Sequence, residues 1–280
     1  MCAPPADATK TVGPMDLIDT HCHLDCPEFD PDRAAVLVRT RAARVVQLVI
    51  PAIHRAGWPG LLALCATDAD LYPALGLHPV YLDQHRDADL PALERAIADD
   101  RPLAIGEIGL DYFVRELDRD RQQALFEAQL AIARSADLPV LLHVRKAHEQ
   151  VLAALKRCPV RGGIAHAFSG GMAEARRYLD LGFALGFGGM LTFERSTKLR
   201  ALAAALPPDA IVLETDAPDL TVAAHRGERN SPEYLPDVLA ALAQVRGEPP
   251  DWLAAKTTLN AQTVLGLTTP QPDVLTEKTR

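Results

Sequence analysis

The feature that most limits the fold is the alternation of short apolar runs with longer amphipathic stretches along most of the chain. Runs rich in Val, Ile and Leu occur eight times, and a stretch with a helical spacing of apolar residues follows each of them. This alternation is typical of βα units, in which helices connect parallel strands. Eight such units are enough to close a barrel. We therefore predict an α/β fold, a single-domain (β/α)8 TIM-like barrel.

An open, doubly wound sheet is the alternative arrangement of the same units. Such sheets often carry a glycine-rich phosphate loop, but neither GxGxxG nor GxxxxGK[ST] follows any of the eight runs. The predicted strands are residues 16–21, 45–50, 72–77, 103–107, 139–143, 163–166, 183–187 and 211–216. The predicted helices are residues 31–43, 57–67, 88–99, 118–136, 147–157, 172–181, 195–205 and 233–245, with a further helix at 251–265.

The length of 280 residues fits one barrel of about 250 residues with a tail at each end. We predict a disordered N-terminal tail over residues 1–14, the barrel over residues 15–267 and a C-terminal tail over residues 268–280. The start of the chain lacks the pattern of a secretory signal, and no run of 18 apolar residues predicts a membrane span. Five cysteines without a CxxC pair favour a reducing, cytoplasmic location.

The formal net charge of −8 excludes a broad basic surface of the kind that coats nucleic acid. A phosphate substrate would therefore need local cations or metal ions.

Polar residues recur where the predicted strands end, which is where the active sites of such barrels are found. They are His21 and His23, His78, Glu107, His143, His166 and Asp216, after strands one, three, four, five, six and eight. Side chains two apart on a strand share a face, so one metal ion could contact both His21 and His23.

Each of these residues has a plainer interpretation when it is taken alone. A short HxH pair is also consistent with surface histidines, Glu107 with a solvated carboxylate, and His143 or His166 with a hydrogen-bonded core histidine. These interpretations need a separate explanation for every strand end.

Four imidazoles and two carboxylates exceed what one tetrahedral structural zinc requires, so the pattern favours two adjacent divalent ions. Glu107 can bridge them, because a carboxylate offers two oxygens whereas a histidine offers a metal one free nitrogen. Imidazole ligands favour Zn or Mn, and phosphate chemistry favours Mg.

These motifs together resemble the TatD-type metal-dependent hydrolases of the amidohydrolase superfamily. The resemblance covers nearly all of residues 15–267 and is carried by DTHCHLD, GLHP, GEIGLDY, LPVLLHVRKA, AHAFSGG, ETDAPDL, RNSPEYLP and NAQTVLGL. It implies a TIM-like barrel with two metal ions, one held by His21, His23, Glu107 and Asp216 and the other by Glu107, His143 and His166.

The resemblance implies a deoxyribonuclease, with 3′–5′ exonuclease activity on DNA ends or short single-stranded nucleic acid. The hypothesis is hydrolysis of a phosphodiester by a water activated at the binuclear centre, with Asp216 and Glu107 as catalytic residues and Asp216 as proton acceptor. A second hypothesis is hydrolysis of a carbonyl substrate such as D-aminoacyl-tRNA. A third is a metal-binding scaffold without catalysis.

Substrate contacts are predicted for His78, Arg145, Arg229 and Asn230, because arginine suits bidentate contact with phosphate oxygens. A capping histidine and solvated loop arginines are the alternative interpretations. Glu214 shares the parity of Asp216 and either supports a ligand histidine or forms a structural ion pair. Phe168, Tyr112 and Phe113 follow ligand-bearing strands, where they either stack on a base or fill a loop core.

Overall fold

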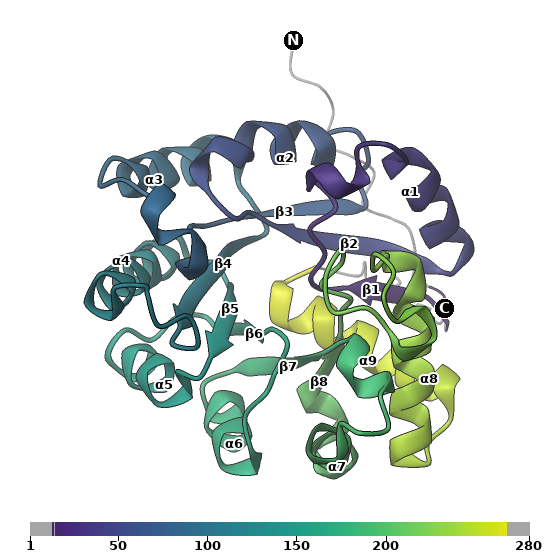
Figure 1. Ribbon diagram of the computed structural model, residues 1–280. Helices are drawn as coiled ribbons and strands as arrows, with labels where there is room; N and C mark the ends of the chain where they lie inside the picture. The colour runs from purple at the N-terminus through teal and green to yellow at the C-terminus, as the bar shows by residue number, and fades with distance from the viewer. Residues whose placement is uncertain (1–12, 14, 268–280) are drawn as a thin grey trace, which may run out of the picture.

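The computed structural model describes residue 13 and residues 15–267. Its strands run parallel in the order β1 to β8, and helices surround them (Figure 1). The strands are β1 (Leu17–Asp19), β2 (Val45–Pro51), β3 (Leu71–Leu75), β4 (Ala104–Asp111), β5 (Val140–Arg145), β6 (Gly163–Ala165), β7 (Phe183–Phe187) and β8 (Ile211–Leu213). The helices are α1 (Arg33–Ala42), α2 (Trp58–Cys65), α3 (Asp89–Asp100), α4 (Arg119–Ala136), α5 (His148–Arg157), α6 (Met172–Asp180), α7 (Thr197–Ala205), α8 (Leu235–Arg246) and α9 (Pro250–Leu265).

The predicted (β/α)8 barrel is confirmed by this order. The two predicted tails, residues 1–14 and 268–280, lie outside the described residues apart from Gly13. Among residues 15–267, no helix combines the length and the hydrophobicity needed to cross a bilayer.

Hydrogen bonds just beyond β1 and β8 bring the first and last strands together. The backbone N–H and the hydroxyl of Thr20 donate to the carbonyl oxygen of Leu213 at 3.1 and 3.0 Å. The N–H of Asp216 donates to the carbonyl oxygen of His21 at 2.8 Å. Residues almost 200 positions apart in sequence therefore become neighbours at the barrel mouth.

The barrel interior is a core of its own. Each strand contributes one buried residue to it, and the set is Ile18, Val49, Ala74, Ala104, Leu141, Ile164, Ala184 and Val212. Helix α9 adds Ala261 and Leu265 and crosses one end of the barrel (Figure 1). Because successive side chains on a strand point to opposite faces, the alternate residues pack outward against the helices in a second, larger core.

Helix α4 illustrates how the local sequence sets an element. The carboxylate of Asp118 accepts a hydrogen bond from the N–H of Arg121 at 3.0 Å and caps the start of the helix. Phe126, Leu130 and Ala133 are buried at helical spacing and form the face that packs on the barrel.

The strand bounds differ from the predicted ones in ways that affect the site. Strand β4 continues to Asp111, so Glu107 lies within the strand and not at its end. The register between β4 and β5 shifts between Ile105 and Ile108, which places an extra residue on β4. Strands β1 and β8 are shorter than predicted, so His21 and Asp216 lie in the segments that follow them. Asp216 has a φ of 58°, a left-handed conformation that an extended strand does not accommodate.

Candidate metal centre

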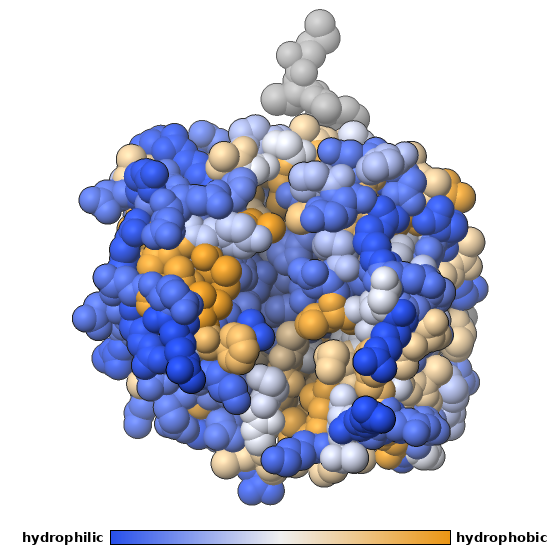
Figure 2. Space-filling model, in the orientation of Figure 1, coloured by the Kyte–Doolittle hydropathy of each residue, from blue (hydrophilic) through white to orange (hydrophobic). Residues whose placement is uncertain are grey.

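The mouth of the barrel gathers the polar residues predicted at the strand ends. Figure 2 shows a hollow in the middle of this face, with hydrophilic residues at its floor. The six residues predicted to bind metal meet there, together with one predicted to bind substrate: His21, His23, Glu107, His143, His166 and Asp216, with His78.

Glu107 lies at the centre of the cluster and is only 1% exposed. Its Oε2 lies 3.1 Å from Nε2 of His21 and 3.4 Å from Nε2 of His23. Oδ1 of Asp216 lies 3.6 and 3.7 Å from the same two nitrogens. One side of Glu107 therefore gathers two imidazole nitrogens and two carboxylate oxygens around one small space.

The other carboxylate oxygen of Glu107 faces a different set of histidines. Its Oε1 lies 2.8 Å from Nδ1 of His143, 3.2 Å from Nε2 of His78 and 3.5 Å from Nε2 of His166. The two oxygens of one carboxylate thus address two separate groups of nitrogen donors, which is the arrangement expected of a bridging ligand.

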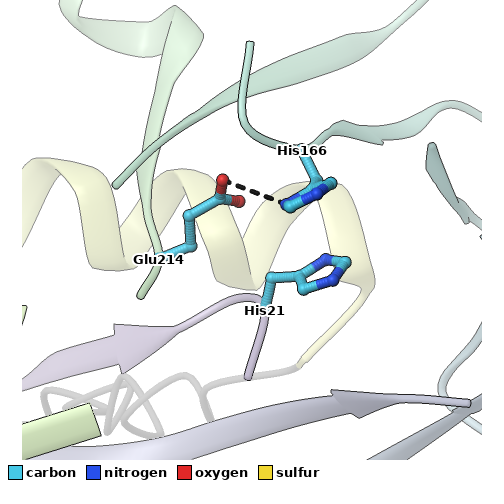
Figure 3. A group of neighbouring side chains, drawn as sticks. All are labelled: His21, His166 and Glu214. Atoms are coloured by element: carbon cyan, nitrogen blue, oxygen red, sulfur yellow. Dashed lines mark ion pairs between the residues drawn. The ribbon is translucent and has the colours of Figure 1, made fainter. Parts of the chain in front are cut away.

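His166 is held on its far side by Glu214. Oε1 of Glu214, which is fully buried, lies 3.2 Å from Nδ1 of His166 and accepts a hydrogen bond from the N–H of Ala167 at 2.5 Å. Figure 3 shows this ion pair beside His21, whose ring stacks on that of His166 with centroids 3.7 Å apart. A carboxylate in this position fixes the tautomer and orientation of a ligand histidine. This contact favours the first of the two interpretations of Glu214.

Asp111 supports His143 in the same way, and the sequence analysis did not single it out. Oδ2 of Asp111 lies 3.0 Å from Nε2 of His143, while Oδ1 accepts hydrogen bonds from the N–H groups of Phe113 and Val114 at 2.9 and 3.1 Å. The available signal was an acidic residue four positions after Glu107 in the motif GEIGLDY. It went unused because the fourth strand was predicted to end at residue 107.

Asp19 is a second buried carboxylate that the sequence analysis did not single out. It accepts hydrogen bonds from the hydroxyl and N–H of Thr215 at 2.5 and 3.0 Å and from the N–H of His21 at 3.2 Å. Burial raises its pKa to about 7. These bonds fix the segments that carry His21 and Asp216 relative to each other.

Burial and the charges packed together in the cluster shift the pKa values of its members. Burial alone would raise the pKa of Glu107, but the charges of His78, His21 and His166 hold it well below its usual value. Burial lowers the pKa of His21 well below its usual value, and the nearby His166 lowers it further. Burial raises the pKa of Asp216 to about 6. An ionised Glu107 beside a neutral His21 is the form in which both groups bind metals. Against the effect of burial, nearby carboxylates raise the pKa of His23 to about 9 and that of His166 to about 10, and they also raise the pKa of His143. A metal that binds these three histidines would therefore displace protons.

The ligand atoms are also close enough to share an ion. Nε2 of His21 and Nε2 of His23 lie 3.3 Å apart, a separation at which two lone pairs face each other unless a proton or a metal lies between them. In the described part of the chain, three groups of side chains bring ligand atoms within reach of one ion: His21, His23 and Glu107; His78, Glu107 and His143; and His21, His166 and Glu214. Mixed nitrogen and oxygen donors of this kind fit Zn or Mn.

The four residues predicted to contact substrate differ in where they lie. His78 contacts Glu107, as given above, and is thus also a possible ligand. Arg145 is exposed, and its guanidinium lies 3.8 Å from the ring centroid of Phe113, itself 54% exposed. Arg229 pairs with Asp32 at 2.8 Å.

Asn230 is fully buried. Its amide donates to the carbonyl oxygens of Thr215 and Asp219 at 2.8 and 2.6 Å. Arg229 and Asn230 therefore use their polar atoms to hold neighbouring segments in place, and substrate contact by the four residues stays a prediction.

Comparison with known proteins identifies related sequences. Residues 18–266 match the family described as TatD related DNase. The metal-dependent hydrolase YjjV of Escherichia coli K12, described as uncharacterized, is 41% identical over 254 residues, which cover 89% of this chain and 98% of that protein. The protein named 3′-5′ ssDNA/RNA exonuclease TatD of Klebsiella pneumoniae strain 342 is 33% identical, with 90% of this chain and 98% of that protein covered.

A solved structure agrees with these matches. The crystal structure of YjjV, described as a TatD homologue from Escherichia coli K12, superposes with a TM-score of 0.86 at 40% identity and covers 90% of this chain and 98% of that one.

Proposed function

Since this chain belongs to the TatD-related DNase family and is a metal-dependent hydrolase, we propose that it shortens single-stranded DNA from the 3′ end by hydrolysing phosphodiester bonds. The observation that carries the proposal is the position of Glu107, whose two oxygens face separate groups of imidazoles. Two neighbouring ions could be held by these groups, and when bound they would stabilise the charge that develops as a phosphodiester is hydrolysed. The name of the Klebsiella relative, a 3′-5′ ssDNA/RNA exonuclease, supports the choice of substrate.

We propose the same ligand sets as the family resemblance implies, with Glu107 shared between them: His21, His23, Glu107 and Asp216 for one ion, and Glu107, His143 and His166 for the other. His78 is a further candidate for the second set. When bound, two divalent ions would lower the pKa of a water molecule and neutralise the charge of the scissile phosphate. Zn, Mn and Mg are the candidates, with Zn or Mn favoured by the donor atoms.

Side chains of the protein carry out the other parts of the proposed reaction. Asp216 accepts the proton of the attacking water on its carboxylate, which lies beside the nitrogens of His21 and His23. Glu214 and Asp111 orient His166 and His143. The exposed pair of Arg145 and Phe113 offers a cation and a ring face to an unpaired base. A cytoplasmic location stays a prediction from the cysteine content.

Removing the metal is expected to abolish hydrolysis, and restoring it is expected to recover the activity. The protein would be stripped with a chelator and incubated with end-labelled single-stranded DNA, and Mg, Mn or Zn would then be added in turn. Stepwise shortening that depends on metal is expected for a strand with a free 3′ hydroxyl. A matched strand whose 3′ end is blocked should stay intact, because an exonuclease needs that end.

Three results would contradict the proposal. Cleavage of the blocked strand at internal positions would indicate an endonuclease. Equal activity with and without metal would exclude the metal-dependent reaction. Failure of the metal-loaded protein to cleave either strand would favour the carbonyl substrate, tested with D-aminoacyl-tRNA, and failure there too would favour the scaffold without catalysis.

Replacing Asp111 with asparagine is expected to weaken metal binding or activity by about 10- to 100-fold. The new amide would donate to Nε2 of His143, which would move the ring proton to Nδ1, the nitrogen that faces Glu107 at 2.8 Å. That nitrogen would then lack the lone pair that a metal needs. Metal titration followed by turnover of single-stranded DNA measures the effect. Asp120→Asn, on an exposed residue of α4, is the matched control, and equal losses in the two variants would refute a role for Asp111.

A further inference from the structure

A large cavity opens beside the metal centre on the side of β6 to β8. Its volume is about 1060 Å³, and it extends from Glu214 and Asp216 to the start of α7. Ligand pockets in proteins commonly measure about 300 to 1,000 Å³, so this one is large enough for a substantial part of a substrate. His78, Arg145, Arg229 and Asn230 do not line it, whereas Phe168, for which base stacking was one of two interpretations, does line it and is 3% exposed.

The walls of this cavity are mainly apolar. Met172, Met190, Leu199 and Leu220 line it, and Met190 and Leu220 are 43% and 40% exposed. Figure 2 shows hydrophobic surface next to the hollow, towards the part of the molecule where Figure 1 places α7. Apolar side chains that stay exposed beside a catalytic centre are available to cover the flat face of an unpaired base.

Two of the glycines that line the cavity stand where a side chain does not fit. A Cβ atom at Gly186 would lie 2.1 Å from the carboxylate of Glu214, and one at Gly189 would lie 2.1 Å from the carbonyl oxygen of Leu220. Glycine at these two positions lets β7 and the turn that follows it pack closely on the segment after β8.

The charges that line the cavity are divided between two sides. Glu214 and Asp216 lie on the side of the metal centre, whereas Arg195 and Lys198 come from the start of α7. Both cations are exposed, and within residues 15–267 neither forms an ion pair. These two side chains are the cations that line the cavity in a chain of net charge −8, and both can contact an anion there. The N-terminal end of α7 adds a partial positive charge on the same side.

Resting on the proposed hydrolysis of single-stranded DNA, we propose that this cavity holds the nucleoside on the retained side of the scissile phosphate, with the next phosphate of the strand bound by Arg195 and Lys198. The terminal nucleoside, which is released, ends in a 3′ hydroxyl. Apart from the scissile phosphate, it carries no phosphate that Arg195 and Lys198 could bind. The retained nucleoside carries one on its 5′ side. Its base would lie against Met190 and Leu220, while its 3′ phosphate reaches the metal centre beside Asp216.

Two substrates that differ only in the 5′ phosphate of the retained nucleoside test the proposed contact of that phosphate with Arg195 and Lys198. A thymidine dinucleotide with a single internal phosphate is compared with the same dinucleotide carrying a 5′ phosphate, using the metal-loaded, full-length protein. The 5′ phosphate is expected to raise kcat/KM about tenfold, since a hydrogen bond between charged groups contributes about that much. In the variant Arg195→Ala/Lys198→Ala this gain is expected to disappear, and the matched control is Lys156→Ala, at the exposed last turn of α5.

The outcomes separate this inference from the proposed function. If the double variant keeps the full gain from the 5′ phosphate, the inference is wrong while the exonuclease proposal stands. If the wild-type protein hydrolyses neither dinucleotide nor longer strands, the proposed function fails and the inference fails with it.

A second substrate tests the apolar wall without changing the protein. In the 5′-phosphorylated dinucleotide, the base of the retained nucleoside is removed to leave an abasic sugar. The loss of its apolar contacts is expected to lower kcat/KM about tenfold. Equal turnover of the abasic and intact dinucleotides would show that the base does not occupy the cavity.

Discussion

Replacing Glu107 with glutamine is expected to lower metal-dependent hydrolysis by at least about 10³-fold, because the bridging position contributes several kcal/mol of charge stabilisation. The amide of glutamine is neutral, and only its oxygen can contact a metal. At present, Oε1 of Glu107 lies 2.8 Å from Nδ1 of His143 and Oε2 lies 3.1 Å from Nε2 of His21. In the variant, one of these two histidines would face an NH₂ group, which binds no ion. The variant is therefore expected to lose at least one ion.

Thermal unfolding with and without metal provides a readout besides turnover. A ligand at about 100 times its Kd adds about 2.7 kcal/mol to the free energy of unfolding, which raises Tm by about 5–10 °C in a domain of this size. Wild type should show such a rise with Zn or Mn, and the Glu107 variant should lose most of it. Glu127→Gln, on a partly exposed residue of α4, makes the same chemical change away from the centre. An undiminished rise in the Glu107 variant would exclude its proposed role as a bridging ligand.

The sequence predicts the barrel well because each strand is a local feature. The run FALGF has no polar side chain and is buried throughout, and VVQLVI has a single polar residue, Gln47. Burial on both faces is what a parallel barrel imposes on its strands. The strand limits were less predictable, since they depend on pairing between distant segments. Residue Glu107 lies inside β4 because the register shift against β5 lets the strand continue to Asp111.

In the candidate site, too, the residues set by local sequence were predictable, and those that depend on distant contacts were not. The six predicted metal ligands lie together at the mouth, since parallel strands bring their carboxyl ends to one place. The supporting carboxylates Asp19 and Asp111 act through contacts with segments far along the chain. The pattern of one strand contains no information about such contacts.

Net charge and local charge have different consequences in this molecule. A chain of net charge −8 repels a polyanion at long range, yet the centre and the cavity beside it offer cations at short range, from bound metal and from Arg195 and Lys198. A strand end needs only such short-range contacts, whereas a long duplex would need contacts over a wider surface of a chain whose net charge is −8. The charge distribution therefore favours ends and short strands as substrates.

Replacing Asp216 with asparagine is expected to lower kcat by about 10²- to 10⁴-fold, the contribution typical of a positioned proton acceptor. Asparagine has nearly the same shape, and the N–H of residue 216 would still donate to the carbonyl oxygen of His21 at 2.8 Å, so the fold should persist. Its amide cannot accept the proton that the carboxylate of Asp216 accepts in the proposed reaction.

Turnover at saturating metal separates the base role of Asp216 from its role as a ligand, because excess metal refills a site that has only become weaker. Asp219→Asn, an exposed residue of the same loop, is the matched control and should retain wild-type kcat. Recovery of wild-type kcat by Asp216→Asn at high metal concentration would leave Asp216 as a ligand alone. A loss that persists in the folded, metal-loaded variant would support proton transfer to this carboxylate as part of the reaction.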